Sequence, residues 1–102
     1  MQSRISIEGI GIKERSFFAK LAAYKLQSRR VALVLGKTIH LHGVSAQDFL
    51  KDECWVKHEL CHIKQFHHYG FIPFLVKYFL EFLRNGYYNN KYEVEARLAE
   101  ND

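Results

Sequence analysis

Two histidines four positions apart, with a glutamate directly after the first, are the side chains in this sequence best suited to chemistry. They are His58, Glu59 and His62 in the stretch "HELCH". On a helix, His62 lies only about 40° from His58, so both imidazoles can converge on one ion at about 2.0–2.1 Å. Glu59 turns about 100° away from His58, too far to ligate easily but within reach of a water bound to that ion. The spacing predicts a zinc site with Glu59 as general base; the structural alternative is a helix that carries two histidines by chance.

Such a site needs a third protein ligand, because catalytic zinc usually has three, with water in the fourth place. The candidates downstream are Glu93 and Glu95 in "NNKYEVEARLAE", which point about 160° apart on a helix. Glu93 also has structural explanations: it stands three residues after a potential cap, Asn90, and one helical turn before Arg97. Because the two-histidine helix lacks a ligand, Glu93 and Glu95 are both candidates to complete the site.

The two motifs together resemble those of a known enzyme family. "HELCH" followed by a glutamate on a later helix is similar to the gluzincins, the zinc peptidases that include thermolysin and the membrane prenyl-protein peptidases. In that family the later helix carries an E-x-x-x-D pattern, and aligning "EVEAR" on it places Glu93 at the ligand and Arg97 where the aspartate stands. The chain also resembles short, poorly characterised bacterial proteins built around HExxHxxQ, with Gln65 as the glutamine, and a late E-x-E-A segment. The resemblance covers residues 38–98.

The resemblance implies Zn²⁺ held by His58, His62 and Glu93, with Glu59 as general base and a peptide or protein as substrate. The function it implies is that of a zinc-dependent metallopeptidase, in which an activated water attacks a peptide carbonyl. The alternative is a catalytically silent zinc-binding domain that acts as a protein-interaction module through its apolar helix.

Two supporting roles are left open by the pattern. The family's aspartate orients a histidine ligand, and with Arg97 in its place this role falls to Gln65, Asp52 or a backbone carbonyl. The oxyanion also needs a hydrogen-bond donor. Tyrosines near the last helix could supply one, and we name Tyr88 and Tyr92 as oxyanion or substrate contacts, with loop packing as the structural alternative.

Hydrophobic periodicity and capping residues indicate the helices that must position these groups. Ser45 is a predicted N-cap for the long helix that carries both histidines, and Gly70 ends that helix. Pro73 is predicted to open the next helix, which Asn85-Gly86 stops. The predicted helices cover residues 14–28, 46–69, 73–84 and 91–102.

A small sheet is predicted beside these helices. Gly36-Lys37 suits a two-residue turn between strands over 31–35 and 38–41, and the alternating isoleucines of residues 5–12 indicate a further strand. The predicted class is therefore α+β: a minimal zincin-like domain, with a small hairpin or sheet packed on the HExxH helix and its flanking helices.

The second strand of the hairpin has a predicted role of its own. Peptidases of the family commonly hold substrate as an added strand on a sheet edge, and we expect residues 37–43 to be that edge. His40 and His42 alternate onto one face of this strand and are expected to face solvent.

Length and composition narrow the class of protein. The 102 residues fit a single domain, 1–102, and a hydrophobic fraction of 48% is typical of a globular chain. The net charge of +4 is spread out, with Arg29 and Arg30 as the one adjacent basic pair, so no nucleic-acid partner is expected. Cys54 and Cys61 would lie about 10.5 Å apart on one helix, beyond disulfide reach. Reduced thiols and the lack of a signal-peptide-like or membrane-spanning apolar run predict a cytoplasmic protein.

The helix "PFLVKYFLEFLR" is unusually apolar, with a single polar stripe of Lys77, Glu81 and Arg84. A core helix is the first interpretation. In so small a domain the core does not fully cover such a helix. The apolar surface that remains exposed predicts a homodimer interface, a hydrophobic substrate groove or a membrane-surface contact through residues 71–83.

Overall fold

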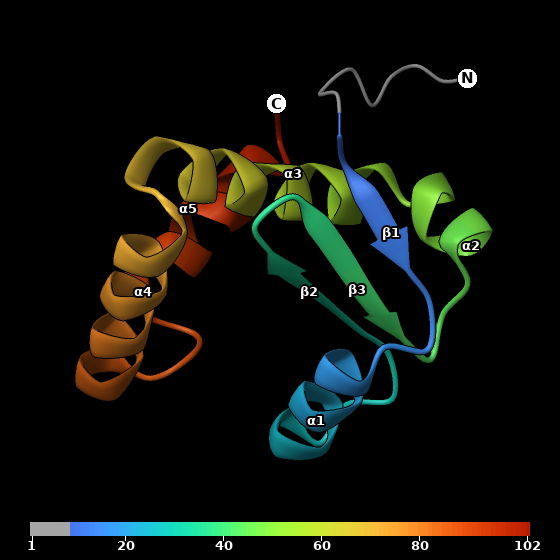
Figure 1. Cartoon of the computed structure of the whole chain (residues 1–102), viewed down its shortest axis with the longest axis horizontal. Helices are drawn as coiled ribbons and strands as arrows, with labels where there is room; N and C mark the ends of the chain where they lie inside the picture. Colours follow the sequence, from blue (N-terminus) through green and yellow to red (C-terminus); the bar gives the residue numbers. More distant parts are fainter. Residues whose placement is uncertain (1–8) are drawn as a thin grey trace.

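The structure is a computed structural model that describes residues 9–102 (Figure 1). In chain order its elements are β1 (Gly11–Lys13), α1 (Phe17–Leu26), β2 (Val31–Leu35), β3 (Thr38–His42), α2 (Ala46–Lys51), α3 (Glu53–Tyr69), α4 (Phe71–Asn85) and α5 (Lys91–Ala99). The described residues combine five helices with a three-stranded mixed sheet, which confirms the α+β class. Of the strand predicted over residues 5–12, the first part lies outside the described residues, and β1 begins at Gly11.

Within the described residues the strand order is β1-β3-β2, so β3 is central and β2 has a free edge. β2 and β3 form the predicted antiparallel hairpin, in which Leu35 pairs with Thr38 across a turn that begins at Gly36, with a φ of 65°. β1 pairs with the other side of β3 in parallel. The prediction that residues 37–43 form the exposed edge is therefore wrong, because β1 covers the side of β3 that the hairpin leaves open.

The two faces of the hairpin pack on different helices because its side chains alternate. Val34 and Ile39 join the main core beneath α3, whereas Val31 joins a smaller cluster with the alanines of α1. His40 faces α1 and is buried there, with its Nδ1 2.8 Å from Ser16 Oγ. The expectation that His40 faces solvent is wrong, because α1 covers that face of the sheet.

The long helix predicted over residues 46–69 is two helices, α2 and α3. Ser45 caps α2 as predicted, accepting a hydrogen bond from the Asp48 amide at 3.0 Å. The chain then breaks at Asp52, whose extended backbone (φ −94°, ψ 93°) leaves its carboxylate free to accept from the Trp55 amide at 3.1 Å. Asp52 is thus the N-cap of α3. A helix of 17 residues remains to carry the HExxH motif.

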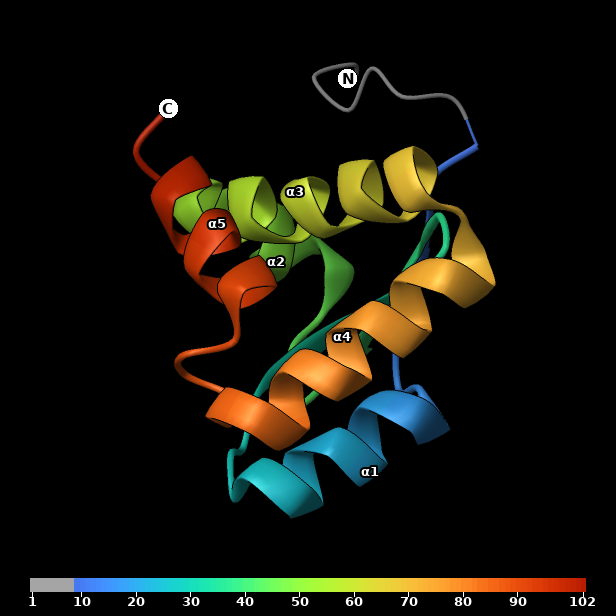
Figure 2. The same ribbon diagram turned by 90° about the vertical axis from the view of Figure 1, so that its left-hand side faces the viewer.

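α4 and α5 follow α3 with short connections. α4 begins at Phe71, two residues earlier than predicted, and Pro73 falls within its first turn, where a missing N–H removes no helical hydrogen bond. Gly86 ends α4 as predicted. Asn90 caps α5 by accepting from the Tyr92 amide at 2.9 Å. In both ribbon views α1 and α4 lie at one end of the molecule, with α3 and α5 at the other (Figure 2).

The cysteines and helix lengths bear on two further predictions. Cys54 and Cys61 are both free, as predicted from their separation on one helix. Among residues 9–102, none of the helices combines the length and the apolar character that a bilayer crossing requires.

Candidate metal centre

α3 and α5 bring His58, His62 and Glu93 together. Glu93 Oε1 lies 2.9 Å from His58 Nε2 and 3.2 Å from His62 Nε2. One ligand atom from each residue lies within 4.8 Å of the others, so the group could hold a metal ion. The structural explanations for Glu93 do not apply: the Asn90 amide donates to the Tyr87 carbonyl oxygen rather than to Glu93, and Arg97 donates to the Tyr88 carbonyl oxygen at 2.5 Å.

The distances from Glu93 Oε1 to the two imidazole nitrogens fit a tetrahedral ion. Ligands about 2.0–2.1 Å from a tetrahedral zinc lie about 3.3 Å from one another. The two distances from Glu93 Oε1, 2.9 and 3.2 Å, are close to that edge length. The same distances would also suit hydrogen bonds, so the protonation of the rings decides between the two.

The hydrogen-bond partner of the second ring nitrogen, Nδ1, shows that this nitrogen of each histidine carries a proton. His58 Nδ1 lies 2.7 Å from Glu100 Oε2, and His62 Nδ1 lies 2.8 Å from Gln65 Oε1. Both oxygens accept, so each Nδ1 carries a proton, and a neutral ring would have its remaining lone pair on Nε2, directed towards Glu93. Two lone pairs and a carboxylate oxygen repel one another unless a cation lies between them. The donor set therefore fits a metal ion. When the ion is absent, protons on the imidazole nitrogens take its place.

Gln65 is the residue that orients His62. Its Nε2 donates to Glu95 Oε1 at 2.6 Å and to the Tyr92 carbonyl at 3.2 Å, which fixes its Oε1 as the acceptor for the imidazole. Glu95, the alternative third ligand, is thus engaged with Gln65 and lies outside the metal group. Of the replacements considered for the family's aspartate, Asp52 is occupied as the cap of α3.

Two residues of the site were missed by sequence reasoning. Glu100, which binds His58, is seven residues beyond Glu93 and therefore on the same side of α5, a spacing that could have identified it. Tyr78 on α4 donates from its hydroxyl to Glu93 Oε2 at 2.5 Å, which leaves Oε1 to face the histidines. It is the one tyrosine of α4, and a lone hydroxyl on a helix of apolar side chains was its signal.

The charges of the centre are strongly coupled through Glu93. Burial alone would raise the pKa of Glu93, but the hydrogen bonds from His58 and His62 outweigh it and hold that pKa well below its usual range. Burial would likewise lower the pKa of His58, but its bond to Glu93 and the nearby Glu59 raise it to about 9. The pKa of His62 is raised for the same reasons. Without metal, the centre is therefore a carboxylate that holds protonated imidazoles.

Glu59 has the electrostatics of a general base. Its side chain is only 4% exposed, and this burial raises the pKa of Glu59 to about 7, against the lowering effect of His62 and His58. A carboxyl group with that pKa exchanges protons near neutral pH. Glu59 lines the same cavity as the three ligands.

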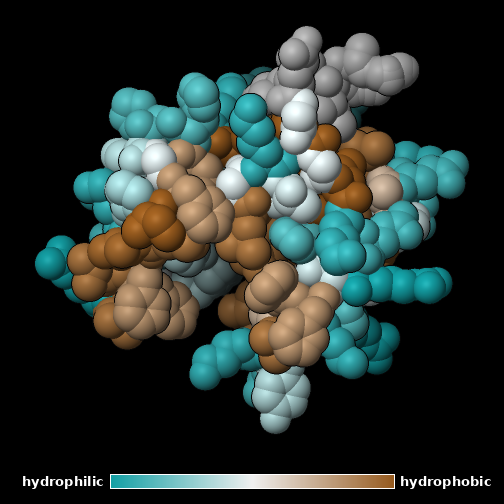
Figure 3. All heavy atoms as spheres, in the orientation of Figure 1, coloured by the Kyte–Doolittle hydropathy of each residue, from teal (hydrophilic) through white to brown (hydrophobic). Residues whose placement is uncertain are grey.

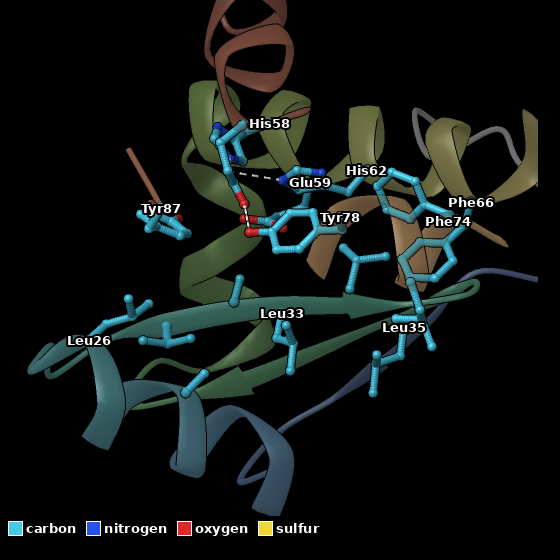
Figure 4. A pocket seen from close by; sticks show the side chains of 16 residues that line it. Leu26, Leu33, Leu35, His58, Glu59, His62, Phe66, Phe74, Tyr78 and Tyr87 are labelled. Atoms are coloured by element: carbon cyan, nitrogen blue, oxygen red, sulfur yellow. Dashed lines mark hydrogen bonds and ion pairs between the residues drawn. The ribbon is translucent and has the colours of Figure 1, made fainter. Parts of the chain in front are cut away.

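A cavity of about 120 Å³ opens beside the ligands, between β2, α1, α3 and α4 (Figure 4). Its polar lining consists of His58, Glu59, His62, Tyr78, Tyr87 and Glu93, and most of the remaining walls are apolar, with all five residues of β2 among them. A second hollow shares Glu59 and Tyr87 with the cavity and continues towards Arg30 and Trp55. Together they form a groove, called the β2 groove below, that follows the free edge of β2 past the metal centre.

Tyr88 and Tyr92, which were predicted to contact the oxyanion or the substrate, do not line this groove. Tyr92 is 5% exposed and packs in the main core with Phe74. Tyr88 is 68% exposed, with the Arg97 guanidinium 4.0 Å from its ring centroid. Tyr87 faces the groove instead, and burial followed by the charge of Glu93 raises the pKa of its hydroxyl, which keeps it a neutral donor.

Comparison of the chain with protein-family models, with curated proteins and with solved structures gives no match. The interpretation of the site therefore rests on its own geometry.

Proposed function

We propose that the protein is a zinc-dependent hydrolase of the gluzincin kind, with peptides as substrates and a minimal zincin-like domain. The observation that carries the proposal is the convergence of His58 Nε2, His62 Nε2 and Glu93 Oε1 beside a buried Glu59. Two imidazoles and one carboxylate form a ligand set of catalytic zinc, and an HExxH helix supplies the base next to the first histidine.

The chemistry divides between the ion and Glu59. When bound, zinc lowers the pKa of water towards about 7 and polarises a carbonyl oxygen. Glu59 takes the proton released when water attacks the carbonyl and returns it to the leaving amine. Tyr78 and Glu100 act on the ligands: each holds one ligand side chain in place by a hydrogen bond to the atom that does not ligate, Glu93 Oε2 and His58 Nδ1 respectively.

The free edge of β2 supports a peptide as the substrate. In a hairpin with a two-residue turn, Leu35 and Thr38 exchange hydrogen bonds, so Ala32 and Val34 direct their N–H and C=O groups away from β3. These groups lie along the β2 groove and can pair with an extended chain. Five residues of strand correspond to about 17 Å, enough for a short peptide on both sides of the scissile bond.

Tyr87 is the best-placed donor for the oxyanion. It lines both parts of the β2 groove beside Glu59, and Figure 4 shows its ring on the same side of the groove as His58. A neutral hydroxyl at that place can donate to the oxygen of a tetrahedral intermediate. Tyr78 lines the groove as well, but its hydroxyl is committed to Glu93.

The proposal is tested by metal content and cleavage together. We expect about one zinc per purified chain in the wild type and none in Glu93→Ala. Glu53→Ala is the control and should keep its zinc, because Glu53 is an exposed carboxylate on α3, the helix of the two histidines. Glu95→Ala should keep most of its zinc, because Glu95 contacts Gln65 and not the ion. Glu59→Gln should keep zinc but lose cleavage of a mixed peptide library about 10²-fold or more. Zinc that survives Glu93→Ala unchanged would contradict the proposed centre.

A silent zinc-binding domain is the second candidate, and one observation favours it: Glu59 is almost wholly buried, which limits access by substrate. This candidate predicts the same zinc content, with no cleavage by the wild type. In that case Glu59→Gln would change neither zinc content nor any partner binding.

A further inference from the structure

α4 has a second apolar stripe that nothing in the described residues covers. Its core-facing side contains Phe74 and Tyr78. A different face carries five large apolar side chains that are about half exposed or more: Ile72, Val76, Phe79, Leu80 and Leu83. At 100° per residue these five fall within about 100° of arc, so they form one continuous stripe. Lys77 and Arg84 border it.

α1 has a stripe of the same kind. Its alanines pack against the sheet, while Phe17, Phe18, Leu21 and Tyr24 are all more than half exposed. Phe17, Leu21 and Tyr24 lie on the side of α1 opposite the alanines, and Phe18 lies next to them with one edge on His40. Lys20 and Lys25 lie beside this stripe. An aromatic stripe bordered by lysines is typical of helices that lie at a membrane surface.

The two stripes lie at the same end of the molecule, on either side of the β2 groove. In the space-filling view, apolar side chains gather over α4 and over α1, with a hollow between them (Figure 3). The cavity beside the metal centre is lined by Leu26 of α1 and by Phe74 and Leu75 of α4, so the two helices are its outer walls. A surface that touched both stripes would lie across the mouth of this cavity.

Charge distinguishes this end of the molecule from the other. No acidic residue occurs between Arg15 and Asp48, a stretch that contains all of α1 and the hairpin. Five basic residues of this stretch lie on or next to α1, namely Arg15, Lys20, Lys25, Arg29 and Arg30, whereas Lys37 lies in the hairpin turn at the far end of β2. α4 adds Lys77 and Arg84 against one acid, Glu81. The surface of α2, α3 and α5 carries both signs in nearly equal number: Asp48, Asp52, Glu53, Glu95, Glu100 and Asp102 are acidic, and Lys51, Lys57, Lys64, Lys91 and Arg97 are basic.

We propose that α1 and α4 dock the protein on the surface of an anionic lipid bilayer. The apolar stripes enter the interface, the lysines and arginines beside them reach the lipid phosphates, and α2, α3 and α5, whose surface charges nearly cancel, face away. A second copy of the chain fits less well, because it would bring two positively charged surfaces together. Duplex nucleic acid fits the charge but not the exposed phenylalanines. Docked this way, the protein opens the β2 groove towards the membrane.

The proposal does not depend on metal or on cleavage, so it is tested separately from the proposed function. The full chain is sedimented with vesicles of equimolar phosphatidylserine and phosphatidylcholine, and with vesicles of phosphatidylcholine alone. We expect stronger binding to the anionic vesicles, weakening as salt is raised. Phe79→Glu and Leu21→Glu should each reduce that binding on the order of ten-fold or more. Lys20→Ala should reduce it about five-fold.

Leu98→Glu is the matched control, because Leu98 is 65% exposed on α5, away from both stripes. Circular dichroism checks that each variant is folded. If Phe79→Glu or Leu21→Glu fails to fold, Lys20→Ala still tests the proposal. Equal binding to both kinds of vesicle, or an equal loss in Leu98→Glu, overturns the proposal. So does a wild type that ignores vesicles and elutes as a dimer that Phe79→Glu dissociates, which would identify an interface between two copies.

Discussion

The free energy of unfolding of the metal-free protein should fall as pH rises through the titration of His58. The folded protein raises the pKa of His58 from 6.5 to about 9, because its bond to Glu93 outweighs the effect of burial. A raised pKa contributes stability that is fully present below pH 6.5 and is lost as pH rises through about 9. At 1.36 kcal/mol per pH unit, this shift corresponds to about 3 kcal/mol. Glu59, with its pKa raised to about 7, contributes in the same direction between about pH 4.5 and 7.

The zinc-bound protein should behave oppositely, because the ion binds only imidazoles that have lost the proton on Nε2, and its affinity therefore increases with pH. Urea unfolding monitored by circular dichroism gives the free energy of unfolding at each pH. A series of pH values, once with chelator and once with zinc, measures how this free energy changes with pH in the metal-free and in the zinc-bound protein. His58→Gln should remove the part of the slope of the metal-free protein that His58 contributes and leave the part that comes from His62, whose pKa is also raised. Stability that is constant or rising between pH 6.5 and 9 in the presence of chelator would refute the reasoning.

Three further predictions concern single side chains. Glu100→Ala should weaken zinc binding about 10- to 100-fold, measured by competition with a chelator, because His58 loses the acceptor at its Nδ1. Tyr87→Phe should lower kcat about 10²- to 10³-fold with unchanged zinc content, and Tyr88→Phe, its exposed neighbour, should leave kcat unchanged. Phe74→Ala should lower the free energy of unfolding by about 3–5 kcal/mol in urea titrations, because Phe74 is 2% exposed at the centre of the aromatic core.

Local spacing explains what the sequence could predict about the site. His58 and His62 share a helix face whatever the tertiary structure, and the turn at Gly36 follows from its neighbours. The choice of Glu93 over Glu95 came from the family resemblance, which aligns Glu93 with the ligand position. Local spacing thus gave two members of the group that could hold a metal, and the third lies 31 residues from His62.

The missed features depend on contacts that no local pattern contains. Tyr78 reaches Glu93 because α4 folds back across α5, and the central place of β3 depends on β1, 27 residues away, pairing with it in parallel. The break at Asp52 was a local signal that was overlooked: an aspartate three residues before an amide that it caps is an ordinary helix start.

The free edge of β2 has a consequence for the behaviour of the protein at high concentration. Its sequence, Val-Ala-Leu-Val-Leu, is uncharged, lacks proline and has strong β-propensity, which are the features of strands that nucleate amyloid-like stacking. α1 and α4 stand on both sides of this edge, so the flat sheet of another molecule cannot approach it as a single extended chain can. The same two helices that shape the groove thus hinder pairing of β2 with another molecule. Shortening either helix should make the protein aggregate.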